Sequence, residues 1–375
     1  MTLTFLVIVS SVIFTGGSGE GSGVDLASLE RWEIVVSKTA TITDQYAAKE
    51  LRDVLKQACD VTLPIVREVS RSDHHFFIGA GEAMQTSAVG FSTDDFSDED
   101  LRIVIKETNI AIAGGRPRGT LYGVYKFLED YLGVRYLTFD HTHVPHVAPR
   151  HVVGPIDVRY NPPLKFRWTF YRETNENPPF ATRMRINTVG TGCTESVSSD
   201  PKLGGKTPIR LVNHSFFDQV SSLKYGEEHP EYYCMRDGRR WLESPTDHRA
   251  QDRQNQPCMT NADVLKIVTR ETLAECESLT DYNTVSVSQN DNDQYCQCPS
   301  CEAINTREGS PMGSLLAFVN SVADAAAAEH PHREIGTLAY QYSRKPPKTL
   351  RPRSNVRVQL CSIECCVIHA LDDPT

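Results

Sequence analysis

Residues 114–130 read GGRPRGTLYGVYKFLED, a glycine-rich turn followed by a segment of helix length. Within that segment Leu121, Val124 and Leu128 recur at the spacing of one helical face. The preceding residues 109–113 are short and apolar, so the pattern predicts a strand, a turn and a helix. Such a turn can present backbone N–H groups to an anion, but we favour a simple tight connection, because the lysine of a phosphate-binding loop is missing.

Strand and helix patterns alternate on the N-terminal side of this stretch. A helix is expected over residues 43–57, where Thr43 and Asp44 supply N-cap chemistry. Two apolar runs that meet at Thr108-Asn109 predict a hairpin. Together these elements predict a small N-terminal α/β domain over residues 30–140. Its expected strands are residues 33–37, 63–66, 75–79, 101–106 and 109–113.

The chain after this domain has two parts. Residues 141–163 are rich in proline and histidine and show little periodicity, so we expect a linker there. From residue 164 onward, short apolar runs are separated by helix-length segments such as 261–277 and 312–329, which predicts a parallel sheet or a (β/α)8 barrel over residues 164–375. A closed barrel needs eight strands, so we expect a (β/α)8-type barrel truncated after about six. The strand candidates are residues 164–171, 186–189, 209–213, 284–288, 335–342 and 356–363.

The composition narrows the class of protein. The net charge of −9 argues against a nucleic-acid partner, because phosphate binding requires a basic surface. The apolar run at residues 3–14, followed by Gly and Ser, predicts a signal peptide or leader over residues 1–24, and hence a secreted or periplasmic protein. A buried first strand is the alternative. After that leader no segment has the length of a membrane span. The pattern does not indicate an oligomeric state.

Several motifs resemble known families. The phrase AGGRPRGTLYGVYKFLEDYLGVRYL is similar to the N-terminal domain of α-glucuronidases and their relatives. The stretches HPEYYCMRDGRR, VSVSQNDNDQYCQCPSCEAIN and LAYQYSRKPPKTLRPRSNVRVQLCSIEC resemble a largely uncharacterised group of bacterial proteins in which that domain precedes an α-glucuronidase-like barrel. The resemblance implies a glycoside-hydrolase fold with a sugar pocket at the C-terminal face of the barrel. It implies α-glucuronidase activity by analogy alone.

Carboxylates at strand ends are the candidate catalytic groups, because side chains at the carboxyl ends of barrel strands face the active site. Glycoside hydrolysis needs one carboxyl group that keeps its proton near neutral pH and another that activates water or attacks the sugar. We predict Asp291 as the acid and Glu364 as the base, with Glu173 in reserve. Asp291 lies in Asn290-Asp-Asn-Asp293, which suits a turn as well as a site.

Other side chains near strand ends are candidates to bind a sugar. Imidazole and amide groups hydrogen-bond hydroxyls, guanidinium groups pair with uronate carboxylates, and aromatic rings stack on the C–H face of a sugar. Tyr340 and Tyr342 are expected to share one face, because side chains alternate along a strand. The substrate-binding candidates are Arg172, Trp168, His214, Asn290, Tyr340 and Tyr342.

The most distinctive local pattern is a trio of cysteines, Cys296, Cys298 and Cys301. Three thiolates so close together can ligate zinc or iron with one further ligand, but no second pair stands at a standard spacing. In an oxidising compartment the trio can instead form disulfides, with Cys258 or Cys276 as partners. We favour a disulfide that staples the loop after the fourth strand, and predict no metal and no cofactor.

The predicted function is therefore hydrolysis of a glycosidic bond in an oligo- or polysaccharide by carboxylate acid–base catalysis. Two alternatives come from the truncated barrel: a carbohydrate-binding protein without catalysis, and a piece of a longer enzyme that is inactive by itself. A metal-dependent protein centred on the cysteines is a third.

Overall fold

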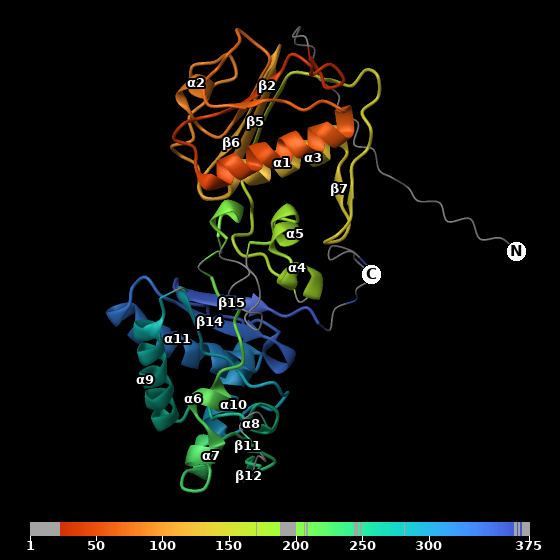
Figure 1. Ribbon diagram of the computed structural model, residues 1–375. Helices are drawn as coiled ribbons and strands as arrows, with labels where there is room; N and C mark the ends of the chain where they lie inside the picture. The colour runs from red at the N-terminus through yellow and green to blue at the C-terminus, as the bar shows by residue number, and fades with distance from the viewer. Residues whose placement is uncertain are drawn as a thin grey trace, which may run out of the picture. The chain divides into compact units, whose positions relative to one another are not determined.

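The computed structural model describes residues 23–169, 171–187, 200–205, 207, 209–243, 247, 250–280, 282–363, 366 and 368–369. The chain divides into two compact units, Met1–Lys206 and Thr207–Thr375, each with its own hydrophobic core (Figure 1). Residues 1–22 of the leader expected at residues 1–24 lie outside the described residues, so the leader stays a prediction. Among the described residues, no helix combines the length and the apolar character needed to cross a bilayer.

The first unit is built on a 6-stranded sheet in the order β10-β5-β6-β4-β2-β3. From β3 to β6 the neighbouring strands are parallel, whereas the β5–β6 and β10–β5 pairs are antiparallel. Strand β5 buries Leu101, Ile103 and Ile105 and turns the alternate residues outward, which is the period-two pattern that predicted it. The strands of this unit are β1 Val24–Asp25, β2 Glu33–Val36, β3 Ile65–Val66, β4 His75–Ile78, β5 Leu101–Lys106, β6 Asn109–Gly114, β7 Arg135–Tyr136, β8 Thr142–His143, β9 Val152–Val153 and β10 Ile156–Tyr160.

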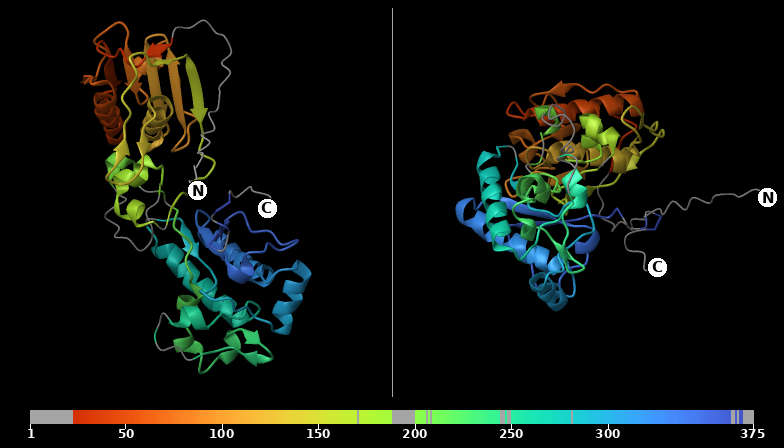
Figure 2. Two further views of the ribbon diagram at one scale, coloured as in Figure 1. Left: turned by 90° about the vertical axis from the view of Figure 1, so that its right-hand side faces the viewer. Right: turned by 90° about the horizontal axis from the view of Figure 1, so that it is seen from below.

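Helices α1 and α3 lie side by side on one face of this sheet, and the region around α2 packs on the other (Figures 1 and 2). Helix α1 starts with a capping box in which the Thr41 hydroxyl accepts from the Asp44 N–H at 3.1 Å and the Asp44 carboxylate accepts from the Thr41 N–H at 3.0 Å. The expected cap at Thr43 therefore lies two residues earlier. The helices of this unit are α1 Ile42–Cys59, α2 Glu82–Gln85, α3 Gly119–Leu132, α4 Arg172–Glu176, α5 Pro178–Arg183 and the 3-10 turn η2 Pro201–Leu203.

The glycine-rich turn before α3 is a tight connection. The N–H of Gly115 donates to the Asp100 carbonyl at 2.8 Å, and the N–H of Gly119 donates to the Gly115 carbonyl at 2.8 Å. These donors are therefore occupied within the protein. A Cβ atom on Gly119 would lie 2.2 Å from the Asp100 carbonyl oxygen. Close backbone packing explains the glycines, and the favoured interpretation is confirmed.

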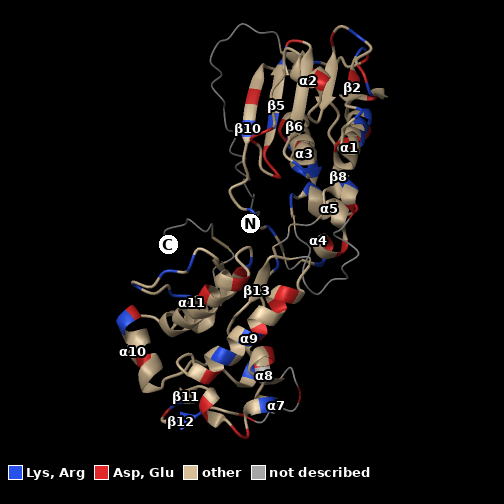
Figure 3. Cartoon of the chain, turned by 90° about the vertical axis from the view of Figure 1, so that its left-hand side faces the viewer, with Lys and Arg blue, Asp and Glu red and all other residues tan. Residues whose placement is uncertain are grey.

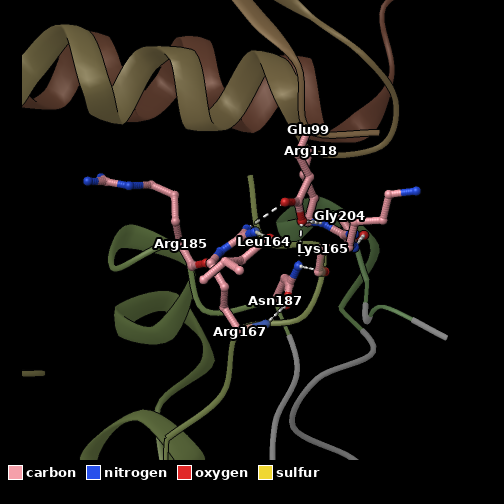
Figure 4. A network of polar contacts seen from close by, with 8 residues as sticks. All are labelled: Glu99, Arg118, Leu164, Lys165, Arg167, Arg185, Asn187 and Gly204. Atoms are coloured by element: carbon pink, nitrogen blue, oxygen red, sulfur yellow. Dashed lines mark hydrogen bonds and ion pairs between the residues drawn. The ribbon is translucent and has the colours of Figure 1, made fainter. Parts of the chain in front are cut away.

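Residues 164–171, expected as the first barrel strand, belong to the first unit and form no strand among the described residues. Their Arg167 guanidinium pairs with Glu99 at 2.5 Å (Figure 4). Glu99 also accepts from Arg118 at 2.8 Å and from Asn187 at 2.9 Å. A buried carboxylate needs such partners, so a long-range network decides the conformation of this segment. A local apolar pattern does not reveal that.

Two other expected segments also differ in the structure. The range 141–163, expected as a linker, contributes β9, which pairs with β1, and β10, which pairs with β5. Of the strand expected at residues 186–189, residues 186 and 187 are not strand, and the other two lie outside the described residues. The proline-rich composition thus hid short antiparallel strands at the edge of the first unit.

The second unit contains a 3-stranded parallel sheet in the order β13-β14-β15, packed against α9 and α11. Three predicted strands and both predicted helices are thereby confirmed, and so is the mixed α/β class. Helix α9 carries acidic and basic residues along its length (Figure 3). The elements of this unit are α6 Phe216–Gln219, α7 Ser222–Tyr225, η3 Pro230–Tyr232, β11 Met235–Arg236, β12 Arg239–Arg240, α8 Ala250–Gln254, α9 Ala262–Ser278, β13 Thr284–Ser286, α10 Pro299–Glu308, α11 Met312–Glu329, β14 Glu334–Ala339, η4 Gln341–Ser343 and β15 Val356–Leu360.

Residues 209–213, expected as the third barrel strand, lie beside this sheet without forming a strand. The Val212 N–H donates to Gln359 Oε1 and the next N–H donates to Ser286 Oγ, both at 3.1 Å. Side chains thus take the place of a backbone ladder. Gly336 permits the close approach, because a Cβ there would lie 2.5 Å from Val212 Cγ2. The (β/α)8-type barrel, expected to be truncated after about six strands, stays a prediction.

Candidate active site

Three of the predicted side chains meet beyond the carboxyl ends of the parallel strands. Asp291 lies in the loop after β13, Tyr340 directly follows β14, and His214 follows the segment beside β13. The Tyr340 hydroxyl donates to Asp291 Oδ1 at 3.2 Å, and His214 Nε2 lies 3.7 Å from the same oxygen. The carboxyl edge of a parallel sheet is where α/β proteins place their ligands. The structure therefore brings these three residues together at the expected edge.

The neighbours of Asp291 are themselves oriented. His214 Nδ1 lies 2.6 Å from the Gln289 carbonyl oxygen, which can only accept, so Nδ1 carries a proton and Nε2 faces the carboxylate. Burial and the adjacent Asp291 carboxylate raise the pKa of Tyr340. Its hydroxyl therefore stays protonated and remains a donor to Asp291.

Asn290, a predicted sugar ligand, is part of the framework of this loop. Its side chain accepts from the Phe217 N–H at 2.7 Å and donates to the Asn255 carbonyl at 2.6 Å. Its main chain is held by Gln256, whose side-chain amide bonds both the N–H and the carbonyl of Asn290. With 2% of its surface exposed, Asn290 is buried in the protein and positions Asp291.

The structure adds a carboxyl group that sequence reasoning missed. Asp252, in α8, accepts a hydrogen bond from the Asp291 N–H at 2.8 Å. Burial raises the pKa of Asp252, and the carboxylate of Asp291 adds to this effect. A carboxyl group shifted in this way keeps its proton to higher pH, as a general acid requires. Because α8 follows no strand, the strand-end rule did not find Asp252.

Asp252 and Asp291 line one cavity of about 520 Å³. This volume falls within the usual range for small-molecule sites. Among the described lining residues, three carboxyl groups stand against one guanidinium group. The described lining residues are Phe217, Asp247, Ala250, Asp252, Arg253, Gln254 and Asp291.

Tyr342 does not share a face with Tyr340, so that expectation is wrong. Strand β14 ends at Ala339, and the chain enters the 3-10 turn η4 through Gln341, whose φ is +49°. The alternation of side chains stops there. The Tyr342 ring packs on Tyr295 with centroids 5.5 Å apart, and burial raises its pKa.

The remaining predicted residues are not brought to this cavity by the described structure. Trp168 belongs to the first unit and donates from Nε1 to Asn175 Oδ1 at 3.0 Å. Arg172 pairs with Glu176 at 2.8 Å on an exposed turn of α4, and Glu173 is its exposed neighbour. Both stand where a strand was expected to end and a helix begins instead. Glu364 lies outside the described residues.

The cysteine trio acquires a fourth member from another segment, Cys258. The four sulfur atoms all lie within 4.8 Å of one another, and all four side chains are buried. Every described cysteine is a free thiol, so the expected disulfide to Cys258 or Cys276 is wrong. Cys276 instead lies on the buried face of α9 and packs in the core of the second unit. We call Cys258, Cys296, Cys298 and Cys301 the cysteine cluster.

Comparison with known families agrees with this architecture. Residues 27–127 match the family model described as the glycosyl hydrolase family 67 N-terminus, which confirms the resemblance to the N-terminal domain of α-glucuronidases. Residues 136–375 match the model described as a domain of unknown function, DUF4838. That match covers more than half of the chain, so the chain belongs to the DUF4838 family. None of the curated proteins matches the sequence.

The solved structures that align with this chain include glycosidases. The GH20 β-N-acetylhexosaminidase from Streptomyces coelicolor A3(2) aligns at 11% identity and a TM-score of 0.43, over 94% of this chain and 69% of that one. The GH115 4-O-methyl-α-glucuronidase BtGH115A aligns at 10% identity and a TM-score of 0.44, over 88% of this chain and 45% of that one. The chitobiase of Flavobacterium johnsoniae aligns at 10% identity and a TM-score of 0.43, over 91% and 52%. These identities and scores are too low to assign an activity.

Proposed function

We propose that the chain is glycoside hydrolase-like and cleaves a glycosidic bond, with Asp252 as the proton donor and Asp291 as a second carboxylate. The observation that carries this proposal is the pairing of two carboxyl groups on one cavity, one of which has a raised pKa. Glycoside hydrolysis generally uses such a pair, divided between an acid and a base or nucleophile. The match of residues 27–127 to a glycosyl hydrolase model supports the same class of reaction.

In the proposed reaction Asp252 gives its proton to the glycosidic oxygen as the bond from that oxygen to the anomeric carbon breaks. A carboxylate removes a proton from water, and the water oxygen bonds to the anomeric carbon. We propose Asp291 for that role, and its contacts with Tyr340 and His214 support the proposal. This assignment replaces the predicted use of Asp291 as the acid, and Glu364 stays a predicted alternative base.

We further propose that the second unit is part of a (β/α)8-type barrel that follows the N-terminal α/β domain. The strands β13, β14 and β15 are parallel and adjacent in chain order, as in a barrel. Asp291, which lines the cavity, and Tyr340, which contacts it, also follow the carboxyl ends of β13 and β14, and a barrel carries its site at that end of its strands. These two features support a barrel-type arrangement of the second unit.

The charge of the cavity supports a neutral, hydroxyl-rich sugar over a uronate. Its described lining includes the carboxyl side chains of Asp247, Asp252 and Asp291, against the guanidinium of Arg253. Carboxylates accept hydrogen bonds from hydroxyls, whereas they repel the carboxylate of a uronic acid. Hydrolysis of neutral aryl glycosides is therefore expected to exceed that of aryl glucuronides.

The test is turnover of aryl glycosides and of glucuronoxylan fragments by the purified full-length chain. Asp252→Asn and Asp291→Asn are each expected to lower kcat by about 10²- to 10⁴-fold, the usual contribution of an acid or base. The matched control is Asp293→Asn, an exposed residue of the same loop, which is expected to keep activity. Glu364→Gln in the same series distinguishes the two candidate bases.

Three outcomes would each contradict a part of the proposal. Full turnover by both Asp252→Asn and Asp291→Asn would overturn the assigned residues. Saccharide binding without turnover in the wild type would favour a non-catalytic carbohydrate-binding protein. Preferred hydrolysis of glucuronides would overturn the neutral-sugar specificity and leave the reaction class in place.

A further inference from the structure

The cysteine cluster joins two segments that are distant in the chain. Cys258 precedes α9, whereas the trio leads into α10, which has Cys298 as its N-cap and Cys301 in its first turn. No member of the cluster has more than 7% of its surface exposed. The sulfur of Cys258 lies 3.5, 3.7 and 3.9 Å from those of the trio, in chain order.

These separations have the dimensions of a tetrahedron around one ion. Four ligands at a zinc–sulfur distance of about 2.3 Å stand about 3.8 Å from one another. A disulfide instead requires two sulfurs at about 2.0 Å and leaves the other two without a role. The geometry of the cluster is therefore that of a four-coordinate metal site.

The surroundings of the sulfurs suit thiolate ligands. The Met235 N–H donates to Cys296 Sγ at 3.3 Å, and the Thr260 hydroxyl lies 3.3 Å from Cys301 Sγ. The N-terminus of the ten-residue helix α10 begins at Cys298, so its free N–H groups and dipole favour negative charge there. Donors of this kind stabilise coordinated thiolates and fix their orientation.

We propose that the cysteine cluster binds one zinc ion as a structural centre. Four thiolates form a soft ligand set that suits zinc and leaves no open position for a catalytic water. The centre links the trio to the segment before α9 through Cys258, and the β11–β12 hairpin is held beside it by the hydrogen bond from the Gln297 N–H to the Met235 carbonyl at 2.7 Å. It thereby holds the end of the loop that carries Asp291. This zinc site does not rest on the proposed function.

The first experiment needs no variant. The purified, reduced full-length protein, expressed in medium with added zinc, is analysed for metals by inductively coupled plasma mass spectrometry, and one zinc per chain is expected. After exchange for Co²⁺, the absorption spectrum should show the thiolate charge-transfer and d–d bands of a tetrahedral cobalt tetrathiolate. Stoichiometric iron, or no metal together with four freely titratable thiols, would overturn the zinc centre. So would a disulfide within the cluster in the mass spectrum.

Substitutions then identify the ligands. Cys258→Ser and Cys301→Ser are expected to lose stoichiometric zinc and to release it to a chromogenic chelator. The matched controls are Cys234→Ala, at a buried cysteine that packs against the cluster, and Cys276→Ala, at a buried cysteine of α9. Both controls should keep one zinc per chain. Zinc retained by both serine variants would overturn the assigned ligand set, and the cobalt spectrum of the wild type decides the case if the variants fail to fold.

Discussion

Glu99 in the first unit is a buried carboxyl group and Asp252 in the second is a partly buried one, and the two are surrounded in opposite ways. Glu99 meets the guanidinium groups of Arg118 and Arg167 (Figure 4). Asp252 has the N–H of Asp291 as a donor and the carboxylate of Asp291 as a neighbour, and burial raises its pKa. Complete pairing makes a carboxylate part of the framework, whereas incomplete pairing shifts its pKa and indicates a site.

The largest expected effect on stability comes from a substitution beside Glu99, the fully paired carboxylate. Replacing Arg118 by Met (Arg118→Met) leaves Glu99 buried with one guanidinium fewer. Because removing one partner of a buried ion pair is strongly destabilising, the free energy of unfolding should fall by about 3 kcal/mol. Urea denaturation followed by circular dichroism measures it.

The control for that substitution is Arg172→Met, which removes an exposed ion pair with Glu176 in the same unit. Exposed pairs contribute little to stability, so no measurable change is expected. Equal unfolding free energies for the two variants would show that the Glu99 network does not stabilise the first unit.

Much of the fold could be predicted because its signals are local. The period-two pattern of β5 and the helical spacing of α3 and α11 depend on neighbours a few residues away, and the structure has these elements as expected. The rule that strand ends face the site likewise selected His214, Asp291 and Tyr340 from three separate segments, and the structure has these three side chains together.

The features that could not be predicted depend on distant partners. The apolar run at residues 164–171 is typical of a strand, but the pairing of Arg167 with Glu99 spans 68 residues. Cys258 was one of two partners considered for the trio, but it stands 38 residues before Cys296, so no spacing rule selects it over Cys276. Asp252 lies in a five-residue helix without periodicity, and only the folded chain places it beside Asp291.

Glu308 in the second unit is a third carboxylate to compare with Glu99 and Asp252. Glu308 accepts from the N–H groups of Thr349 and Leu350 at 2.8 and 3.0 Å and from the Thr349 hydroxyl at 2.7 Å. The Leu350 N–H and these other donors lower the pKa of Glu308 to about 2. Because the folded state favours the charged form, the stabilisation is present above the ordinary pKa of 4.5 and is lost as pH falls towards 2.

Glu308→Gln should therefore lower the melting temperature at neutral pH, since an amide group in place of the carboxylate opposes these donors. The difference from the wild type should shrink steadily below pH 4.5. Thermal unfolding of both proteins across this range measures the effect. A difference that is independent of pH would mean that the charge of Glu308 has no part in holding the 348–350 segment.

The smallest expected effect is a gain in stability, and it comes from a substitution of Asp252. Because the pKa of Asp252 is raised above 3.8, the folded state binds this proton more tightly than the unfolded state, and stability falls as pH rises through the folded pKa. Asp252→Asn should therefore raise the melting temperature slightly at pH values above the folded pKa, where the wild type bears the unfavourable charge, and the gain should vanish below pH 3.8. Asp293→Asn is the control and should show no such gain. If Asp252→Asn instead lowers the melting temperature, Asp252 is a framework residue like Glu99. A general acid that destabilises the fold predicts the opposite result, in which the variant is more stable than the wild type and loses turnover.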